Sequence, residues 1–175
     1  MKKIIIFIMI FFSFISCKKT EITNLPPLTS ENISGKSLWN RIIVENNYKK
    51  YKMWPDHEGL QEGQSPHGRF HKIYINKQLY NSLPIPDKVA PYDSIIVEEN
   101  YNIQKELRNI DVMIKIADYN PDFSDWFWAT FTPDGKIVNE GQVENCIDCH
   151  LGMFDNDFII VHPLDKSLDK KEINK

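Results

Sequence analysis

The chain has 175 residues and a mass of 20.6 kDa, the size of one ordinary domain with short additional segments. Hydrophobic residues make up 42% of it and aromatic residues 12%, so a wholly disordered protein is excluded. The net charge of −3 argues against a general nucleic-acid-binding protein, which is normally basic. Its three cysteines, Cys17, Cys146 and Cys149, are too few for a disulfide scaffold, so each needs its own explanation.

The first 16 residues have the pattern of a secretory signal peptide. Lys2 and Lys3 precede an apolar run, residues 4–12, that is too short to span a bilayer core of roughly 30 Å. The Phe-Ile-Ser-Cys sequence that ends at Cys17 resembles the lipobox of bacterial lipoproteins, in which cleavage exposes an acylated cysteine. We therefore expect a lipoprotein signal peptide over residues 1–16 and a lipid on Cys17, with an ordinary secreted protein as the alternative.

The segment that follows is polar and lacks hydrophobic periodicity. Residues 17–35 are rich in Lys, Thr, Asn, Ser and Pro, which is typical of a tether. We expect residues 36–175 to form the folded domain, held by its lipid at the bacterial cell envelope on the periplasmic or outer-surface side.

The folded part begins with a predicted helix. Leu38, Ile42 and Ile43 have helical spacing, which predicts a long amphipathic helix over residues 37–51 with Ser34 or Gly35 near its start. A polar loop is expected over residues 56–68. A short helix is expected at residues 76–83, and strands are expected at residues 70–75, 94–99, 111–117, 126–132 and 136–140.

This order of elements predicts the fold class. The last two strands flank a Pro-Asp-Gly turn and form a hairpin, and no βαβ alternation is seen. We expect an α+β fold, mainly an antiparallel β-sheet with a long N-terminal helix and a few short helices.

Cys146, Cys149 and His150 form a CxxCH motif. Two thiols three residues apart on one helical turn can each add to a haem vinyl group, and the next residue then offers an imidazole to the iron. We expect one haem c, covalently held through Cys146 and Cys149, with His150 as the proximal ligand. A zinc site, a thioredoxin-like redox pair and a plain disulfide remain as alternatives, although no second CxxC or βαβ setting accompanies the motif.

The sixth ligand of such an iron is not evident. Met153 lies only three residues after His150, on the proximal side, and Met53 and Met113 lie upstream. A methionine on a strand, such as Met113, is usually a core residue. We therefore expect an open or water-capped iron, and we keep His67 and His71 as further candidate ligands.

Several short segments together resemble the cytochrome P460 family, which includes the β-type cytochromes c′. The resemblance covers residues 39–157 and rests on Ser65-Pro66-His67-Gly68, Tyr74-Ile75-Asn76, Tyr119-Asn120-Pro121, Asp125-Trp126-Phe127-Trp128-Ala129 and the CxxCH motif. It implies a mainly antiparallel β domain, often dimeric, that holds one c-type haem with His150 proximal.

The sequence departs from this family at one functional position. True P460 enzymes have a lysine that cross-links to the haem, and Glu98 stands where the resemblance places that lysine, with Lys72 and Lys115 as fallback candidates. Whether the chain is an enzyme is therefore left open. Glu98 is our candidate distal acid that relays a proton to an iron-bound ligand, unless it is an ordinary solvent-facing glutamate.

Three aromatic residues are candidates for the haem pocket. Phe70 is expected to cap the distal face as an apolar lid, or else to be a core residue. Trp126 and Trp128 point to the same face of their strand, where they would line the haem or fill the sheet core.

The sequence thus predicts an exported, membrane-anchored, mono-haem c-type cytochrome. It would bind or convert small nitrogen ligands such as nitric oxide or hydroxylamine, or pass electrons. The alternatives are a six-coordinate electron-transfer cytochrome c and a non-haem lipoprotein that uses Cys146 and Cys149 as a redox or metal site. Expected partners are a small ligand at the iron, a redox protein, the membrane and a possible second copy, without nucleic acid.

Overall fold

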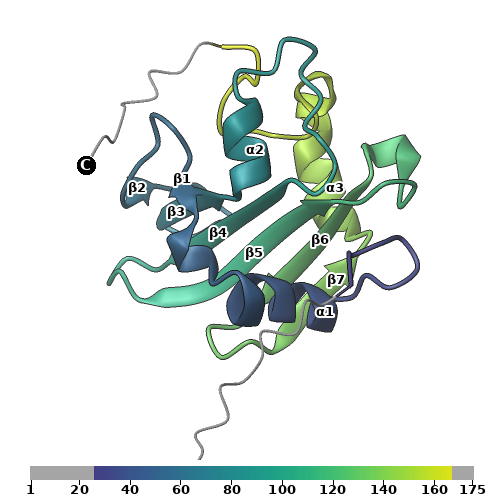
Figure 1. Cartoon of the computed structure of the whole chain (residues 1–175). Helices are drawn as coiled ribbons and strands as arrows, with labels where there is room; N and C mark the ends of the chain where they lie inside the picture. Colours follow the sequence, from purple (N-terminus) through teal and green to yellow (C-terminus); the bar gives the residue numbers. More distant parts are fainter. Residues whose placement is uncertain (1–25, 167–175) are drawn as a thin grey trace, which may run out of the picture.

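The computed structural model describes residues 26–166, so the predicted signal peptide and Cys17 lie outside the described residues. A seven-stranded sheet forms the centre of the domain, in the order β1-β3-β4-β5-β6-β7, with β2 paired to β3 (Figure 1). All pairings are antiparallel. The strands are β1 Lys52–Met53, β2 Gln61–Glu62, β3 Phe70–Ile75, β4 Ile95–Tyr101, β5 Leu107–Lys115, β6 Trp126–Phe131 and β7 Ile137–Gly141. The predicted α+β fold with a mainly antiparallel sheet is confirmed.

The helices are short. They are α1 Gly35–Asn40, the π-helical η1 Arg41–Glu45, the 3-10 helix η2 Tyr48–Lys50, α2 Lys77–Ser82, η3 Pro121–Phe123, α3 Glu144–His150 and η4 Leu151–Asn156. The expected long N-terminal helix is wrong. Its start agrees with the sequence, because Ser34 caps α1 in a capping box with Ser37. Regular helix ends at Asn40, and the chain breaks at Asn47, whose φ of 42° is left-handed.

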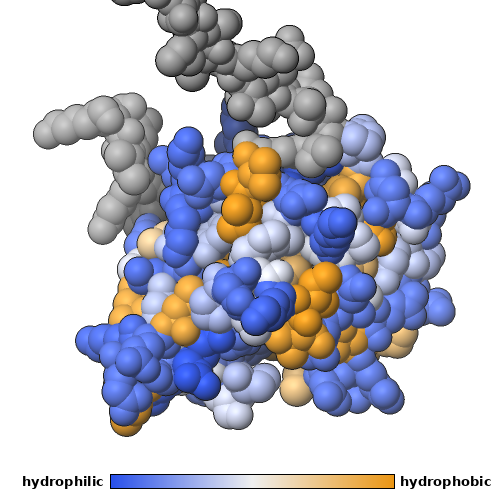
Figure 2. Space-filling view, turned by 90° about the horizontal axis from the view of Figure 1, so that it is seen from below, coloured by the Kyte–Doolittle hydropathy of each residue, from blue (hydrophilic) through white to orange (hydrophobic). Residues whose placement is uncertain are grey.

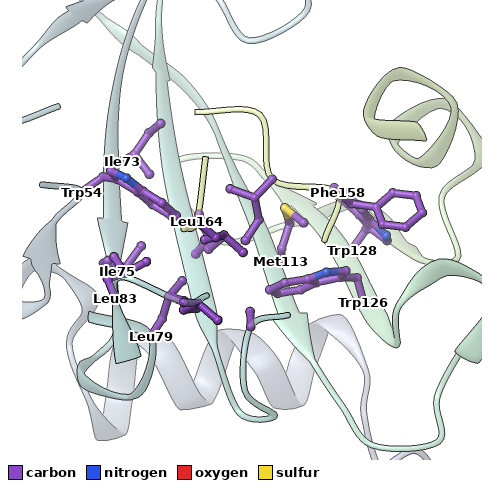
Figure 3. Close-up of a cluster of buried hydrophobic side chains, with 14 of the residues drawn as sticks. Trp54, Ile73, Ile75, Leu79, Leu83, Met113, Trp126, Trp128, Phe158 and Leu164 are labelled. Carbon is purple, nitrogen blue, oxygen red and sulfur yellow. The ribbon is translucent and has the colours of Figure 1, made fainter. Parts of the chain in front are cut away.

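The two faces of the sheet have separate cores, because side chains alternate along each strand. On the α1 side, Leu38 and Ile42 pack on strand residues such as Val97, Val112 and Phe127. On the other side, α2 and α3 cover the sheet (Figure 1). Figure 3 shows this second cluster, which includes Trp54, Ile75, Leu79, Met113, Trp126, Trp128 and Phe158.

The α1 face also holds a buried carboxylate. Glu99 of β4 is fully buried and accepts hydrogen bonds from Tyr48 at 2.8 Å, Tyr101 at 2.7 Å and Tyr74 at 3.3 Å. The Lys49 ammonium pairs with the same carboxylate. This cluster joins η2 to three neighbouring positions of the sheet and fixes the chain that leads into β1.

Part of the segment assigned to the tether lies on the domain. Leu28 and Ile33 pack against the α1-side core, and the Arg41 guanidinium donates to the Pro26 carbonyl. Within residues 26–166, no helix has the length and apolar character needed to cross a membrane. The face seen in Figure 2 is mostly hydrophilic, with hydrophobic residues in separate patches, as on the surface of an ordinary domain.

Candidate functional site

The CxxCH motif lies on α3, which packs on the sheet through the buried Ile147. Cys146 is half-buried and Cys149 is exposed, and neither thiol is in a disulfide. Burial raises the pKa of Cys146 to about 11, which keeps its sulfur a neutral thiol at ordinary pH. The helix therefore presents both thiols on one turn, as the spacing predicts.

His150 ends α3 with its ring in a fixed orientation. Its Nδ1 lies 2.6 Å from the Phe158 carbonyl oxygen, and its ring centre lies 4.8 Å from that of Trp128. Burial lowers the pKa of His150 and so favours the neutral imidazole. A neutral imidazole that donates from Nδ1 has its lone pair at Nε2, which is the arrangement of a histidine that binds a metal.

A buried ion pair fixes the segment that orients His150. Asp157 precedes Phe158, and its carboxylate lies 2.6 and 2.8 Å from the Lys115 ammonium of β5 and accepts from the Ala90 amide at 2.8 Å. The Trp126 indole donates to the Asp157 carbonyl at 2.9 Å. Burial raises the pKa of Asp157, and the hydrogen bond from Lys115 opposes this effect. The Phe158 carbonyl is thereby held in place against the sheet.

Two adjoining cavities open between α3, the sheet and the loop before β3. Their volumes are about 280 Å³ and about 550 Å³; the larger volume is within the usual size range of cofactor sites and the smaller is just below it. They share lining residues: Pro66, His67, Ile96, Glu98, Met113, Cys149 and His150. The smaller cavity is also lined by Cys146 and Trp128. Two free thiols and an oriented imidazole around a partly apolar cavity form a donor set that fits a covalently held haem.

One wall of these cavities is polar. Glu98 lies 2.7 Å from His71 Nδ1 and 3.4 Å from His67 Nδ1. Burial lowers the pKa of His67, but its hydrogen bond to Asp111 at 3.0 Å and the nearby carboxylates outweigh burial, so that its pKa is raised overall. The His67 ring centre lies 6.1 Å from that of His150.

The structure gathers some of the sequence-predicted site residues and leaves others outside. Glu98 and Trp128 line the cavities together with Cys146, Cys149 and His150. Trp126 lies in the core on the same sheet face, with its indole on Asp157 rather than in either cavity. Phe70 lines neither cavity and lies beside Arg69 and Lys105.

Neither fallback lysine lines the two cavities. Lys72 lies over the ring of Tyr101, and Lys115 is paired with Asp157. Among the described residues, the cavity linings contain the carboxylates of Glu62, Glu98 and Asp111 but no lysine. Met113 lines both cavities and also belongs to the core.

Sequence reasoning missed Asp111 and His57. Asp111 lies two positions before Met113 on β5, so both side chains point to the same face of the sheet and line the smaller cavity. Strand alternation alone could have placed Asp111 there. It accepts hydrogen bonds from Asn100 at 2.7 Å and Thr130 at 2.7 Å. His57 lies in an irregular loop and approaches His71 only through tertiary folding, so no local signal reveals it.

Within residues 26–166, no group of three or more His, Cys, Asp and Glu side chains is arranged to hold a bare metal ion. An antiparallel sheet with a CxxCH helix over a partly apolar cavity defines a haem-binding, cytochrome c-like protein. The sequence model of the Cytochrome P460 family matches residues 46–161, more than half of the chain. The chain therefore belongs to the Cytochrome P460 family. No curated protein matches the chain.

Proposed function

We propose that the chain would hold one haem c through thioether bonds from Cys146 and Cys149, with His150 as a ligand of its iron. We further propose that it binds or converts small nitrogen ligands such as nitric oxide or hydroxylamine. One observation carries the proposal. Two unpaired thiols lie on the same helical turn as an imidazole whose Nδ1 is held by a carbonyl, and all three line one cavity of about 280 Å³.

When bound, the haem would supply an iron that coordinates the small ligand and exchanges electrons with it. Residues of the chain orient His150 and form the cavity wall beside the iron. The Phe158 carbonyl orients His150, and Trp128 packs on its ring. Glu98 would donate or accept a proton at its carboxylate in the shared wall of the two cavities. The family resemblance places Glu98 where the cross-linking lysine is expected, and the described cavity linings contain no lysine, so no cross-link to the haem is proposed.

The attachment is tested by producing the chain together with haem-maturation machinery. We expect a pyridine haemochrome of the c type and a mass increase of one haem that persists after denaturation. The Cys146→Ala/Cys149→Ala variant should lose both, while a matched Cys17→Ser variant should keep both. An unmodified mass for the wild-type protein under these conditions would refute the proposal.

A six-coordinate electron carrier is the second candidate, and the position of His67 favours it. His67 and His150 both line the two cavities, and their ring centres are 6.1 Å apart, so the two imidazoles would hold one iron together. The Asp111 carboxylate at His67 Nδ1 leaves Nε2 for a metal. High-spin ferric and ferrous spectra that shift on adding nitric oxide support the first candidate, whereas low-spin spectra that become high-spin in His67→Gly support the second.

We also propose that residues 1–16 are a signal peptide and that lipid on Cys17 anchors the protein to the bacterial cell envelope. The charged-then-apolar pattern and the Phe-Ile-Ser-Cys sequence support this. Export agrees with covalent haem, since c-type haem is attached outside the cytoplasm. Labelling with an alkyne fatty acid should mark the wild type but not Cys17→Ser, and labelling of both proteins would contradict the anchor.

A further inference from the structure

A chain of hydrogen-bonded side chains leads from a part-exposed histidine to the carboxylate shared by the two cavities. His57 Nε2 lies 2.7 Å from His71 Nε2, and His71 Nδ1 lies 2.7 Å from Glu98 Oε1. His57 belongs to the loop between β1 and β2, where its neighbours Asp56 and Glu58 are exposed. The His71 side chain is 15% exposed and the Glu98 side chain is 17% exposed. The chain therefore runs from the protein surface inward.

The chemistry of these groups fixes the direction of the hydrogen bonds. An ionised carboxylate only accepts, so the nitrogen of His71 that faces Glu98 carries the hydrogen. A neutral His71 then has its lone pair at Nε2, and His57 must donate to it from its own Nε2. Both N–H donors consequently point toward Glu98. The remaining nitrogen, His57 Nδ1, carries a lone pair that can accept a proton from solvent.

We propose that His57 and His71 form a relay that delivers protons from solvent to Glu98; this rests on the proposed function, because the relay serves the reduction or conversion of a ligand beside that carboxylate. A proton from hydronium or a buffer acid adds to His57 Nδ1. The His57 Nε2–H bond breaks as His71 Nε2–H forms, and the His71 Nδ1–H bond breaks as an O–H bond forms on Glu98 Oε1. One proton enters, one reaches Glu98, and no electron moves.

The relay ends at Glu98 because of its place between the cavities. His57 and His71 line only the larger cavity, whereas Glu98 lines both. Its Oε2 is 3.4 Å from His67 Nδ1, longer than an ordinary hydrogen bond, so that oxygen remains available to a group in the smaller cavity.

Two other carboxylates line the cavities. Glu62 is exposed and pairs with Arg69, and Asp111 is less suited to proton transfer. Asp111 accepts from Asn100 at 2.7 Å, Asn109 at 3.2 Å, Thr130 at 2.7 Å and His67 at 3.0 Å. Four donors fill the acceptor positions of one carboxylate. Its side chain thus holds the wall in place, and Glu98 is the carboxylate that a hydrogen-bonded path joins to the surface.

Proton uptake that follows reduction of the haem measures this relay. The holoprotein is reduced by a laser flash with a ruthenium bipyridine complex in weak buffer, and a pH-indicator dye reports the amount and the rate of uptake. In the wild-type holoprotein we expect proton uptake through the relay to accompany reduction of the haem. Glu98→Gln should abolish the uptake, whereas His57→Gln and His71→Gln should keep its amount and slow it by roughly 10- to 100-fold.

His162→Gln is the matched control. The His162 ring lies 2.9 Å from the Pro163 carbonyl oxygen and lines neither cavity, so this variant should leave the rate unchanged. Uptake at the wild-type rate in His57→Gln and His71→Gln would overturn the relay while leaving the proposed haem site intact. Wild-type holoprotein that takes up no proton would also overturn it. Absence of the c-type haemochrome would instead refute the proposed function, and the relay with it.

Discussion

The ion pair behind the proximal histidine allows a quantitative test of how the site is held. Asp157 and Lys115 are 3% and 4% exposed, and the carboxylate bonds the ammonium through both oxygens. Asp157→Asn would leave the Lys115 ammonium buried without its counter-ion, which typically costs about 3–5 kcal/mol. That is a large share of the about 5–15 kcal/mol that stabilises an ordinary domain.

The double variant Lys115→Met/Asp157→Asn separates this cost from a general loss of packing. With both charges removed, no ion remains buried, and the side-chain amide introduced at position 157 can still accept from the Ala90 amide. We therefore expect the double variant to regain about 2 kcal/mol relative to Asp157→Asn alone. Urea denaturation followed by circular dichroism measures the free energies of unfolding.

The free energies of unfolding of the two variants decide whether the Asp157–Lys115 ion pair holds the segment around Phe158. A loss below about 1 kcal/mol in Asp157→Asn, the range of exposed pairs, would refute the argument. So would a double variant that is less stable than Asp157→Asn. Because the Phe158 carbonyl orients His150, we also expect the haem absorption bands of Asp157→Asn to shift in the folded protein.

Three further predictions test other parts of the domain. Glu99→Ala should lower the free energy of unfolding by about 3 kcal/mol, because three tyrosine hydroxyls lose their acceptor at about 1 kcal/mol each. Gly135→Ala should cost about 1–3 kcal/mol, since its φ is 86° and a Cβ would lie 2.6 Å from the Trp39 ring, whereas Gly152→Ala, with open space around it, should cost little; equal urea midpoints would contradict this. Trp128→Leu should shift the haem absorption bands, because Trp128 contacts His150 in the cavity wall, whereas Phe70→Leu should not shift them. Equal shifts in the two variants would contradict the placement of the haem in these cavities.

Local signals in the sequence identified most of the elements. Strands β3, β4, β6 and β7 and helix α2 agree with the prediction to within two residues, because β-branched and aromatic runs alternate with turn residues there. The strand that became β5 begins at Leu107, earlier than expected, in a polar stretch whose pairing with β4 is visible only in the sheet. The prediction of a long N-terminal helix was wrong, because the spacing of hydrophobic residues gives no sign that Asn47 adopts a left-handed conformation.

The site was predicted where its chemistry is contained in a short motif and was missed where it depends on long-range contacts. Cys146, Cys149 and His150 lie within five consecutive positions, so their spacing alone places two thiols and an imidazole on one helix. Glu98 was found through the family resemblance. Phe70 and Trp128 could not be distinguished from the sequence, because both are aromatic residues on strands. Only the places of β3 and β6 in the folded sheet show that Trp128, and not Phe70, faces the cavities.

Cys146, Cys149 and His150 were the strongest feature of the sequence, since a CxxCH motif has a chemical meaning that does not depend on the fold. The composition and the strand pattern also determined an antiparallel α+β domain. Only the tertiary structure decided that His57, His71 and Glu98, drawn from a loop and two strands, form one hydrogen-bonded chain. It likewise decided that Lys115 holds Asp157 rather than entering the cavities. The physical reason is that sheet register and loop packing bring distant residues within hydrogen-bonding distance, and no local pattern encodes these contacts.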